Sequence, residues 1–394
     1  MNTTYRGIIT LVKSAVTGEK LALPEGFSLE QADELICKHS LLPLAYQGAY
    51  NCGIPKDSQI MQRYQAQYFR ALIRSEQQLQ AIERLFRAFE ENGIDYLPVK
   101  GCNMKKLYPK PELRIMGDAD VLIRMEQYDR IRSIMQQLGY EEKNGSAHEL
   151  PWRSASLYLE LHKTLLPKKD KDLRRYFGEG WDRAVKGEGH RYDLSIEDSY
   201  LFIFSHMTKH FRFGGIGVRQ IVDLYVYRRA HPDMNEALID QAVAELCQTE
   251  FYNNIQRLLS VWFSDAPEDP VTDFITDYVF HNGNWGTVEN WFYSEELVHA
   301  QKAGKIKNSG FNAFFRLLFM PLDRMKTRYK ILYKYPFLCP VFWVVRWFDV
   351  LLHTPKNIGR RLGVVREMTD EKVAAYRQAM NYMGLDYSYE EEKE

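Results

Sequence analysis

The chain has 394 residues, 45% of them hydrophobic and 26% charged, which is typical of folded globular proteins and predicts two or three domains. Lysines plus arginines and aspartates plus glutamates both number 52, so no chain-wide field directs the protein to nucleic acid or an anionic membrane, and any basic site is local. The five cysteines are widely spaced without a C-x-x-C pair, which argues against a disulfide framework or a zinc site and favours the cytoplasm.

The first 92 residues carry a helical pattern. The opening stretch MNTTYRGIITLVKSAVTGEK has neither a long apolar core nor a small-residue cleavage site, so we expect it to belong to the fold and not to a signal peptide. Apolar residues at three- and four-residue spacing predict helices over 28–50 and 58–92, and Gly93 supplies a stop for the second. We therefore expect an N-terminal helical region, 1–92.

The spacing of the apolar residues changes after residue 93. Strands are predicted over 95–101, 118–125 and 156–167, and a helix over 127–140. This order predicts a small α/β unit within 93–190.

Helical spacing returns near residue 195. A loop is predicted at 263–274, and an irregular aromatic stretch at 280–297 ends a helical domain, 191–300. An aromatic and basic helical region, 301–394, follows. The whole chain is therefore predicted to be α+β and mostly helical, with a small mixed sheet flanked by helical regions. The helices expected after residue 195 are 196–211, 219–231, 233–248 and 251–263.

Two aspartates interrupt an apolar run in RIMGDADVLI, residues 114–123. Residues two apart on a strand face the same side, so Asp118 and Asp120 repel each other when both are ionised. Such a pair is favourable in water or around a hard cation such as Mg²⁺ or Mn²⁺. In a second interpretation, Asp118 belongs to a turn and Asp120 is solvated at the strand edge, and the motif alone does not decide between the two.

Groups suited to phosphate and metal surround this strand. Upstream, YLPVKGCNMKKLYP predicts a strand, a turn at Gly101 and a helix, whose first N–H groups suit a phosphate. Downstream, LELH places Glu160 and His162 on one strand face, which adds a third carboxylate. The nearby cations are Lys100, Lys105 and Lys106.

The order of these motifs resembles a known family. LPVKGCNMKKLYPKPELRIMGDADVLI followed by LELH is similar to the bacterial uncharacterised nucleotidyltransferases, a group within the DNA polymerase β-like nucleotidyltransferase superfamily. Residues 205–227 and 333–348 resemble later segments of that group more loosely. Cys102 departs from the superfamily pattern, which usually has serine, and a thiol is a weaker donor to phosphate than a hydroxyl.

The resemblance implies a nucleotidyltransferase core that moves NMP from an NTP to an acceptor and releases pyrophosphate. It implies that Asp118, Asp120 and Glu160 are catalytic and hold Mg²⁺ or Mn²⁺, with Glu160 also able to take the acceptor's proton. The acceptor is a small molecule, a sugar or polymer precursor, or a protein hydroxyl. The residues expected at substrate or phosphate are Lys100, Gly101, Cys102, Arg114, His162, His206, His210 and Arg219.

Several of these side chains have a structural interpretation as well. His162 either orients the acceptor or is a strand-edge histidine bonded to backbone. His206 and His210 are one helical turn apart, a spacing that can bind metal, but without a third ligand a structural or substrate-lining role is favoured. Arg219 either lines the cleft or pairs with Asp223 on the same helix.

The sequence leaves other functions and partners open. A non-catalytic nucleotide-binding regulator or antitoxin-like module is the main alternative, and nucleic acid is an unexpected partner because no basic surface is evident. Residues 311–352 alternate basic and large apolar side chains, which is typical of a membrane-surface segment or of a packed helical subdomain, and the prolines favour packing. A membrane-spanning helix over 335–352 is not expected, because Pro340, Arg346 and Asp349 interrupt it. No oligomeric state is predicted.

Overall fold

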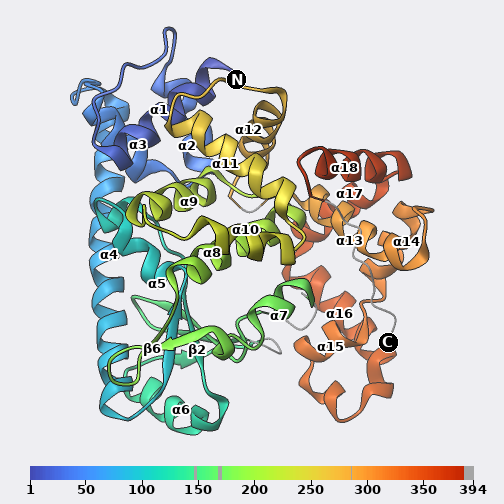
Figure 1. Cartoon of the computed structure of the whole chain (residues 1–394). Helices are drawn as coiled ribbons and strands as arrows, with labels where there is room; N and C mark the ends of the chain where they lie inside the picture. Colours follow the sequence, from blue (N-terminus) through green and yellow to red (C-terminus); the bar gives the residue numbers. More distant parts are fainter. Residues whose placement is uncertain (146–148, 167–170, 285, 386–394) are drawn as a thin grey trace. The chain divides into compact units, whose positions relative to one another are not determined.

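The computed structural model describes residues 1–145, 149–166, 171–284 and 286–385 (Figure 1). The chain forms two compact units, Met1–Thr208 with Ile216–Asn284 and Lys209–Gly215 with Trp285–Glu394. Helices predominate and one small mixed sheet is present, so the predicted α+β class is confirmed. The finer division at 92, 190 and 300 stays a prediction.

The N-terminal helices begin at the residue types that favour helix starts. The side chains of Asn2, Ser28 and Ser58 each accept a hydrogen bond from the backbone N–H three residues later. The long helix α4 ends just before Gly93, whose φ of +65° suits glycine, as predicted. These helices are α1 (Thr3–Thr17), α2 (Leu29–Lys38), α3 (Leu42–Asn51) and α4 (Gln59–Glu91).

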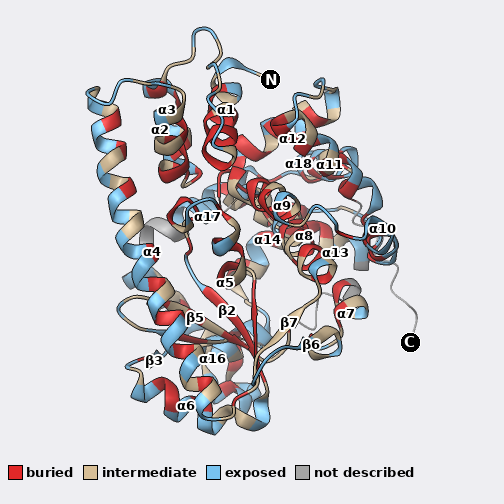
Figure 2. Ribbon diagram, turned by 60° about the vertical axis from the view of Figure 1, so that its left-hand side comes forward, coloured by how far each residue is buried: buried red, intermediate tan, exposed pale blue. Residues whose placement is uncertain are grey.

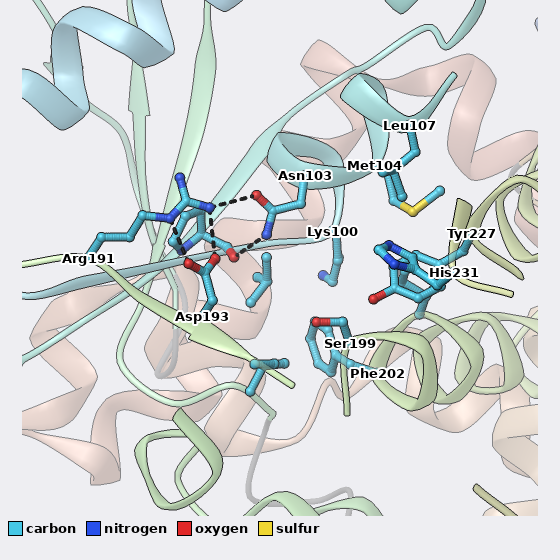
Figure 3. A pocket seen from close by; sticks show the side chains of 14 residues that line it. Lys100, Asn103, Met104, Leu107, Arg191, Asp193, Ser199, Phe202, Tyr227 and His231 are labelled. Atoms are coloured by element: carbon cyan, nitrogen blue, oxygen red, sulfur yellow. Dashed lines mark hydrogen bonds and ion pairs between the residues drawn. The ribbon is translucent and has the colours of Figure 1, made fainter. Parts of the chain in front are cut away.

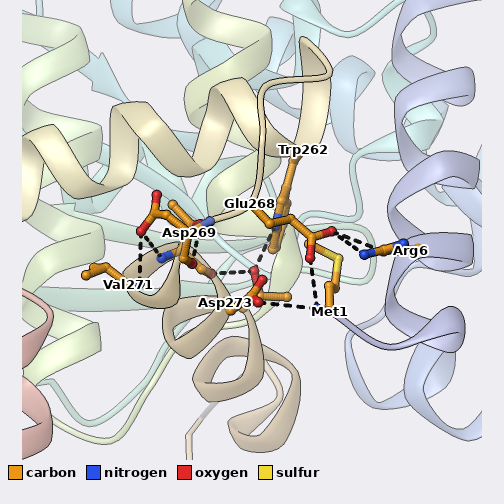
Figure 4. Close-up of polar contacts among 9 residues, drawn as sticks. Met1, Arg6, Trp262, Glu268, Asp269, Val271 and Asp273 are labelled. Atoms are coloured by element: carbon orange, nitrogen blue, oxygen red, sulfur yellow. Dashed lines mark hydrogen bonds and ion pairs between the residues drawn. The ribbon is translucent and has the colours of Figure 1, made fainter.

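The amino group of Met1 connects the start of the chain to a distant helix (Figure 4). It donates to Glu268 at 2.9 Å and to Asp273 at 3.4 Å, and Arg6 also contacts Glu268. Asp273 lies on α12 (Pro270–Asn282). The start of the chain is therefore joined to α12 by charge, and the ring of Tyr5 in α1 stacks on that of Phe280 in α12.

The five-stranded sheet has the order β1-β2-β5-β4-β3. Strand β2 pairs antiparallel with β1 and parallel with β5, while β4 pairs antiparallel with both of its neighbours. The three predicted strands are present. Strands β3 and β4 and the hairpin β6–β7 were not predicted, because they are short or, in β4, lack alternation and contain a proline. The strands are β1 (Tyr96–Val99), β2 (Ala119–Ile123), β3 (Glu141–Glu142), β4 (Glu149–Arg153), β5 (Tyr158–His162), β6 (Ala184–Lys186) and β7 (Tyr192–Leu194).

Strand β2 is buried along its whole length (Figure 2). One face of this sheet packs into a hydrophobic core, and the other carries polar groups. Val121 and Leu159 belong to a core shared with α4 and α6 (Tyr128–Gln137), whereas Asp120 and Glu160 alternate with them and face the other way. The alternation that was predicted for LELH is therefore confirmed. Short helices connect these strands: α5 (Gly101–Met104), η1 (Lys105–Leu107), η2 (Pro111–Leu113), η3 (Met125–Gln127), α7 (Lys171–Phe177) and η4 (Trp181–Arg183).

Two helices after residue 263 were missed by the sequence analysis. Helix α12 starts at the predicted loop, where Asp269 caps the N–H groups of Val271 and Thr272 and Pro270 takes the first helical position. Asp269 followed by Pro270 is a sequence pattern typical of a helix start, so the beginning of α12 could have been predicted. Helix α13 (Val288–Ala303) is aromatic on several sides, so its period is weak. The preceding helices, all expected, are α8 (Ile196–Arg212), α9 (Val218–Ala230), α10 (Glu236–Glu245) and α11 (Thr249–Phe263).

The second unit is helical, with a small core around Met325, Leu332 and Cys339. One of its segments, Pro336–His353, is long and apolar enough to cross a membrane by length and composition. This differs from the expectation drawn from its proline and charged residues. The remaining elements of the unit are α14 (Ser309–Leu318), α15 (Leu322–Arg328), η5 (Lys330–Tyr333), η6 (Pro336–Leu338), α16 (Cys339–His353), α17 (Pro355–Glu367) and α18 (Asp370–Tyr382).

Candidate active site

The pairing of β2 with β5 brings two of the predicted acids together. Asp120 lies directly opposite Glu160 in the parallel register, and Leu122 lies opposite His162. One ligand atom from each of Asp120, Glu160 and His162 lies within 4.8 Å of the others, a spacing that can hold a metal ion. His162 thus joins the two acids, while Asp118, which was expected there, is outside this three-residue cluster.

Asp120 is the most constrained of these acids. It is 4% exposed, and its Oδ1 accepts from Lys100 Nζ at 3.2 Å and lies 2.8 Å from His162 Nε2. Burial by itself raises the pKa of Asp120, but the charge of Lys100 and the His162 contact outweigh it and lower the pKa below its ordinary value. Asp120 is therefore a carboxylate at neutral pH.

Glu160 has the opposite electrostatic character. Burial, and then the charges of Asp120, Glu149 and Asp118, raise the pKa of Glu160 to about 7. Glu149 lies on β4, diagonal to Glu160, and was missed because its strand carries no clear alternation. At pH 7, in the metal-free protein, Asp120 is therefore ionised while its neighbour Glu160 is partly protonated. Such a difference in protonation between two neighbouring acids can separate the roles of acid and base.

The raised pKa of Glu160 makes a prediction about stability in the metal-free protein. The folded state holds a proton that the unfolded state releases between about pH 4.5 and pH 7, so ionised Glu160 costs stability above that window and costs nothing below it. In EDTA, Glu160→Gln should therefore raise the free energy of unfolding at pH 8 by about 1–3 kcal/mol, with no comparable gain at pH 4.5. Urea unfolding at both pH values measures this, and Glu126→Gln, at an exposed acid, should show no such difference. An equal gain at both pH values would contradict it.

Asp118 lies one residue before β2 and is exposed. The protein around it limits its hydration, and with the charge of Asp120 this raises the pKa of Asp118, while Lys100 and Arg219 lower it. The guanidinium of Arg219 donates to the carbonyl of Ile115 at 2.7 Å, and its Nε has no hydrogen-bond partner among the described residues. Lys100 and Arg219 are thus cations near the acids.

The turn before α5 has an unusual backbone conformation at Lys100 and passes close to the start of β2 at Gly101. Lys100 has φ +47° and ψ −113°, an unusual conformation for a non-glycine residue. A Cβ on Gly101 would lie 3.1 Å from Met116 Sδ and 3.2 Å from the carbonyl oxygen of Asp118, so glycine permits the close approach of this turn to the start of β2. The turn therefore holds Lys100 against Asp120.

Cys102 and the following helix differ from expectation. The Cys102 thiol is buried in the core and contacts the carbonyl oxygen of Asp120 at 3.8 Å, and burial raises its pKa to about 12, so it does not face phosphate. Helix α5 is a single turn, Gly101–Met104, too short for a strong dipole. Lys105 is buried as well, and donates to the carbonyl of Arg114 at 3.0 Å.

Arg114 has a structural partner in the protein instead of an open position for substrate. Its guanidinium donates twice to Asp223, Nε to Oδ1 at 2.8 Å and Nη2 to Oδ2 at 2.9 Å, and Tyr108 also donates to Asp223. Burial opposes the charge of Arg114, but Asp223 outweighs burial and raises the pKa of Arg114. Asp223 therefore pairs with Arg114 and not with Arg219, whose pairing with Asp223 was one of the two interpretations of that residue.

His206 and His210 both lie on α8, where His206 is half-buried and His210 exposed. Neither belongs to a three-ligand cluster of the described residues.

A cavity of about 260 Å³ lies beside Lys100 (Figure 3). Met104, Leu107 and Phe202 supply apolar walls. The other lining residues are Pro98, Val99, Asn103, Arg191, Asp193, Leu194, Ser199, Ile203, Tyr227 and His231.

Comparison with known proteins identifies the family. Residues 26–264 match the model of the family described as uncharacterised nucleotidyltransferase. The chain belongs to this family. The predicted recognition, and with it a transferase enzyme, is therefore confirmed, and the matched range contains both the acids and the cavity.

Other comparisons add little to this nucleotidyltransferase. No curated protein matches the chain. A solved structure, the antibiotic-resistance factor ANT(2'')-Ia, covers 49% of this chain and 100% of its own at 12% identity, with a TM-score of 0.32. A likeness at this level says nothing about the substrate.

Proposed function

We propose that this nucleotidyltransferase moves NMP from an NTP to a hydroxyl acceptor, supported by Mg²⁺ or Mn²⁺. The observation that carries the proposal is the position of Asp120 opposite Glu160, with ligand atoms within 4.8 Å and Lys100 beside them. An NTP and an acceptor are thus the partners, and the acceptor class stays open among small molecules, sugar or polymer precursors and protein hydroxyls.

The described residues fit a divalent cation. Both contacts of Asp120 go to Oδ1, and no described residue donates to Oδ2. Two carboxylates suit Mg²⁺, and the addition of the His162 imidazole suits Mn²⁺ at least as well. Asp120 and Glu160 would hold the ion, with His162 as a third ligand or as the group that orients Asp120, and Asp118 close by. When bound, the ion offsets phosphate charge and aligns the reacting oxygens.

Glu160 is suited to receive the acceptor's proton. In the metal-free protein the pKa of Glu160 is raised to about 7, and a bound cation would lower it, so that Glu160 is ionised and able to accept a proton. As the acceptor oxygen bonds to the α-phosphorus, the bond from that phosphorus to the bridging oxygen breaks, pyrophosphate leaves and Glu160 takes the proton. Lys100 and Arg219 compensate the triphosphate charge.

The cavity beside Lys100 is the proposed position of one substrate. It shares Lys100 with the acids, and it combines an apolar wall at Phe202 with a polar end at Arg191 and Asp193, which are paired at 2.7 Å. Pockets of this character bind small organic groups. A nucleoside or a compact acceptor fits this description, and the cytoplasm, where the five free cysteines stay reduced, is the proposed location.

Turnover and binding are measured together to test the function. We expect wild-type protein with each NTP and Mg²⁺ or Mn²⁺ to release pyrophosphate in the presence of acceptor pools such as sugars and hydroxyl-bearing proteins. Thermal shift with the same nucleotides reports binding. Stabilisation by NTP without any pyrophosphate release across all pools would support the regulator alternative instead. If NTP neither stabilises the protein nor leads to pyrophosphate release, both functions are contradicted.

A further inference from the structure

The exposed side of helix α16 is entirely apolar until its last residue. Its most exposed large apolar side chains are Leu352 at 75% and Phe348 at 63%. These positions recur at three- and four-residue spacing and form one stripe. The exposed residues of α16 before His353 are Pro340, Val341, Val344, Val345, Phe348, Leu351 and Leu352.

The opposite side of α16 is fixed to the second unit. Trp343 Nε1 donates to the carbonyl of Met320 at 2.8 Å, and Trp347 Nε1 to that of Leu318 at 2.9 Å. Arg346 is 4% exposed and donates to the carbonyl of Leu317 at 3.1 Å. The interrupting arginine is thus used inside the unit, and the apolar stripe faces away from these contacts.

Basic residues flank the stripe on both sides. Residues 309–367 contain eleven lysines and arginines but only three aspartates and glutamates, in a chain whose net charge is zero. Lys330 and Lys334 precede α16, and Arg360, Arg361 and Arg366 follow it. These five are exposed, and none forms an ion pair within the described part of the chain. In the sequence, the apolar stripe therefore lies between segments that carry exposed positive charge.

We propose that α16 lies in the interface of an anionic membrane, with its apolar stripe among the acyl chains and the flanking basic residues at the headgroups. Interfacial helices have this combination of an apolar face and cationic flanks. The surface of a soluble monomer rarely leaves such a row uncovered. The inference does not depend on the proposed transfer reaction.

Two other occupants fit the surface less well. A protein partner usually contributes about one hydrogen bond per 100–200 Å² of interface, and this stripe offers no side-chain donor or acceptor. A second copy of the chain would bring its own basic flanks against these, and like charges oppose each other. An anionic membrane offers acyl chains to the apolar stripe and negatively charged headgroups to the basic residues.

The helix lies in the membrane plane and does not cross it. The 18-residue segment Pro336–His353 is long enough to span by length and composition, so the contacts of α16 decide between the two placements. The packed side of α16 carries the buried Arg346, which a spanning helix would expose to lipid. The apolar segment Pro336–His353 is therefore assigned to the interface.

Co-sedimentation of the full chain with vesicles tests this placement. We expect binding to phosphatidylcholine vesicles that contain phosphatidylglycerol, weaker binding to phosphatidylcholine alone, and loss of most binding in about 1 M salt, where the Debye length is about 3 Å. The variant Val344→Asp/Phe348→Asp should bind at least about tenfold more weakly. No binding by wild type at low salt would overturn the proposal.

A matched control separates this surface from general effects of adding charge. Phe69 and Ile73 on α4 are also four residues apart, and are 52% and 59% exposed, so Phe69→Asp/Ile73→Asp makes the same change elsewhere. It should bind vesicles like wild type. Equal weakening in both double variants would overturn the proposal.

Further measurements deal with misfolding and with the other occupants. If circular dichroism shows that Val344→Asp/Phe348→Asp is unfolded, Leu352→Asp replaces it, because this side chain is the most exposed of the stripe. Sedimentation velocity without lipid reports self-association: a wild-type dimer that the stripe variant abolishes would overturn the proposal in favour of a second copy. Protein that stays with vesicles after an alkaline carbonate wash would overturn the in-plane placement in favour of a spanning helix.

Discussion

Asp120→Asn should lower kcat/KM for nucleotidyl transfer by about 10³-fold or more, because it removes the negative charge that holds the cation and balances Lys100. Asn has nearly the same shape and still accepts a hydrogen bond at its Oδ1, so the side-chain contacts of the buried site change little. The loss should therefore appear in turnover and in Mn²⁺ binding. Both are measured with the same protein preparations, by pyrophosphate release and by titration calorimetry.

The matched control for this variant is Asp129→Asn. Asp129 lies in the first turn of α6 and is exposed, so the same chemical change there should leave turnover and metal binding unchanged. Wild-type turnover by Asp120→Asn would remove Asp120 from the catalytic site.

Asp223→Ala should lower the free energy of unfolding by about 3–5 kcal/mol, the usual cost of leaving a buried charge without its partner. Asp223 accepts two hydrogen bonds from Arg114 and one from Tyr108, and all three side chains are buried. Removal of the carboxylate leaves the guanidinium with no counter-charge. Urea unfolding at pH 7 measures the change.

An exposed ion pair provides the comparison for that variant. Glu83 and Arg87 pair on the surface of α4, with side chains 69% and 63% exposed, and Glu83→Ala should cost no more than about 0.5 kcal/mol. Similar losses in the two variants would show that the Arg114–Asp223 pair does not stabilise the fold as its geometry implies.

The sequence predicted the acidic strand well, because the signal there is local. Alternation places Asp120 and Glu160 opposite the core-facing Val121 and Leu159, and this follows from the period of a strand. Which strands are neighbours, and in what register, is not local. The proximity of Asp120 to Glu160 rested on family resemblance, and only the β2·β5 pairing places their ligand atoms within reach.

The basic residues could not be assigned from sequence for a related reason. Lys100, Lys105 and Arg114 look equivalent in a motif, but the cation that stays available depends on which ones the fold buries and pairs. Arg114 forms an ion pair with Asp223, which is 109 residues away, and Lys105 donates a hydrogen bond to the carbonyl of Arg114. Glu149 went unnoticed because its short strand with a proline shows no alternation. Contacts between distant segments decide these outcomes.

The parallel register between β2 and β5 also determines which length changes the enzyme tolerates. The side chains of a strand alternate between its two faces, so an insertion of one residue inside β5 would turn Glu160 from the acidic face into the hydrophobic core. An insertion at the exposed residues Lys143 and Asn144, which follow β3, would leave the pairing of β2 with β5 intact. Relatives of this protein should therefore differ in length between the two acidic strands while each strand itself keeps a fixed length.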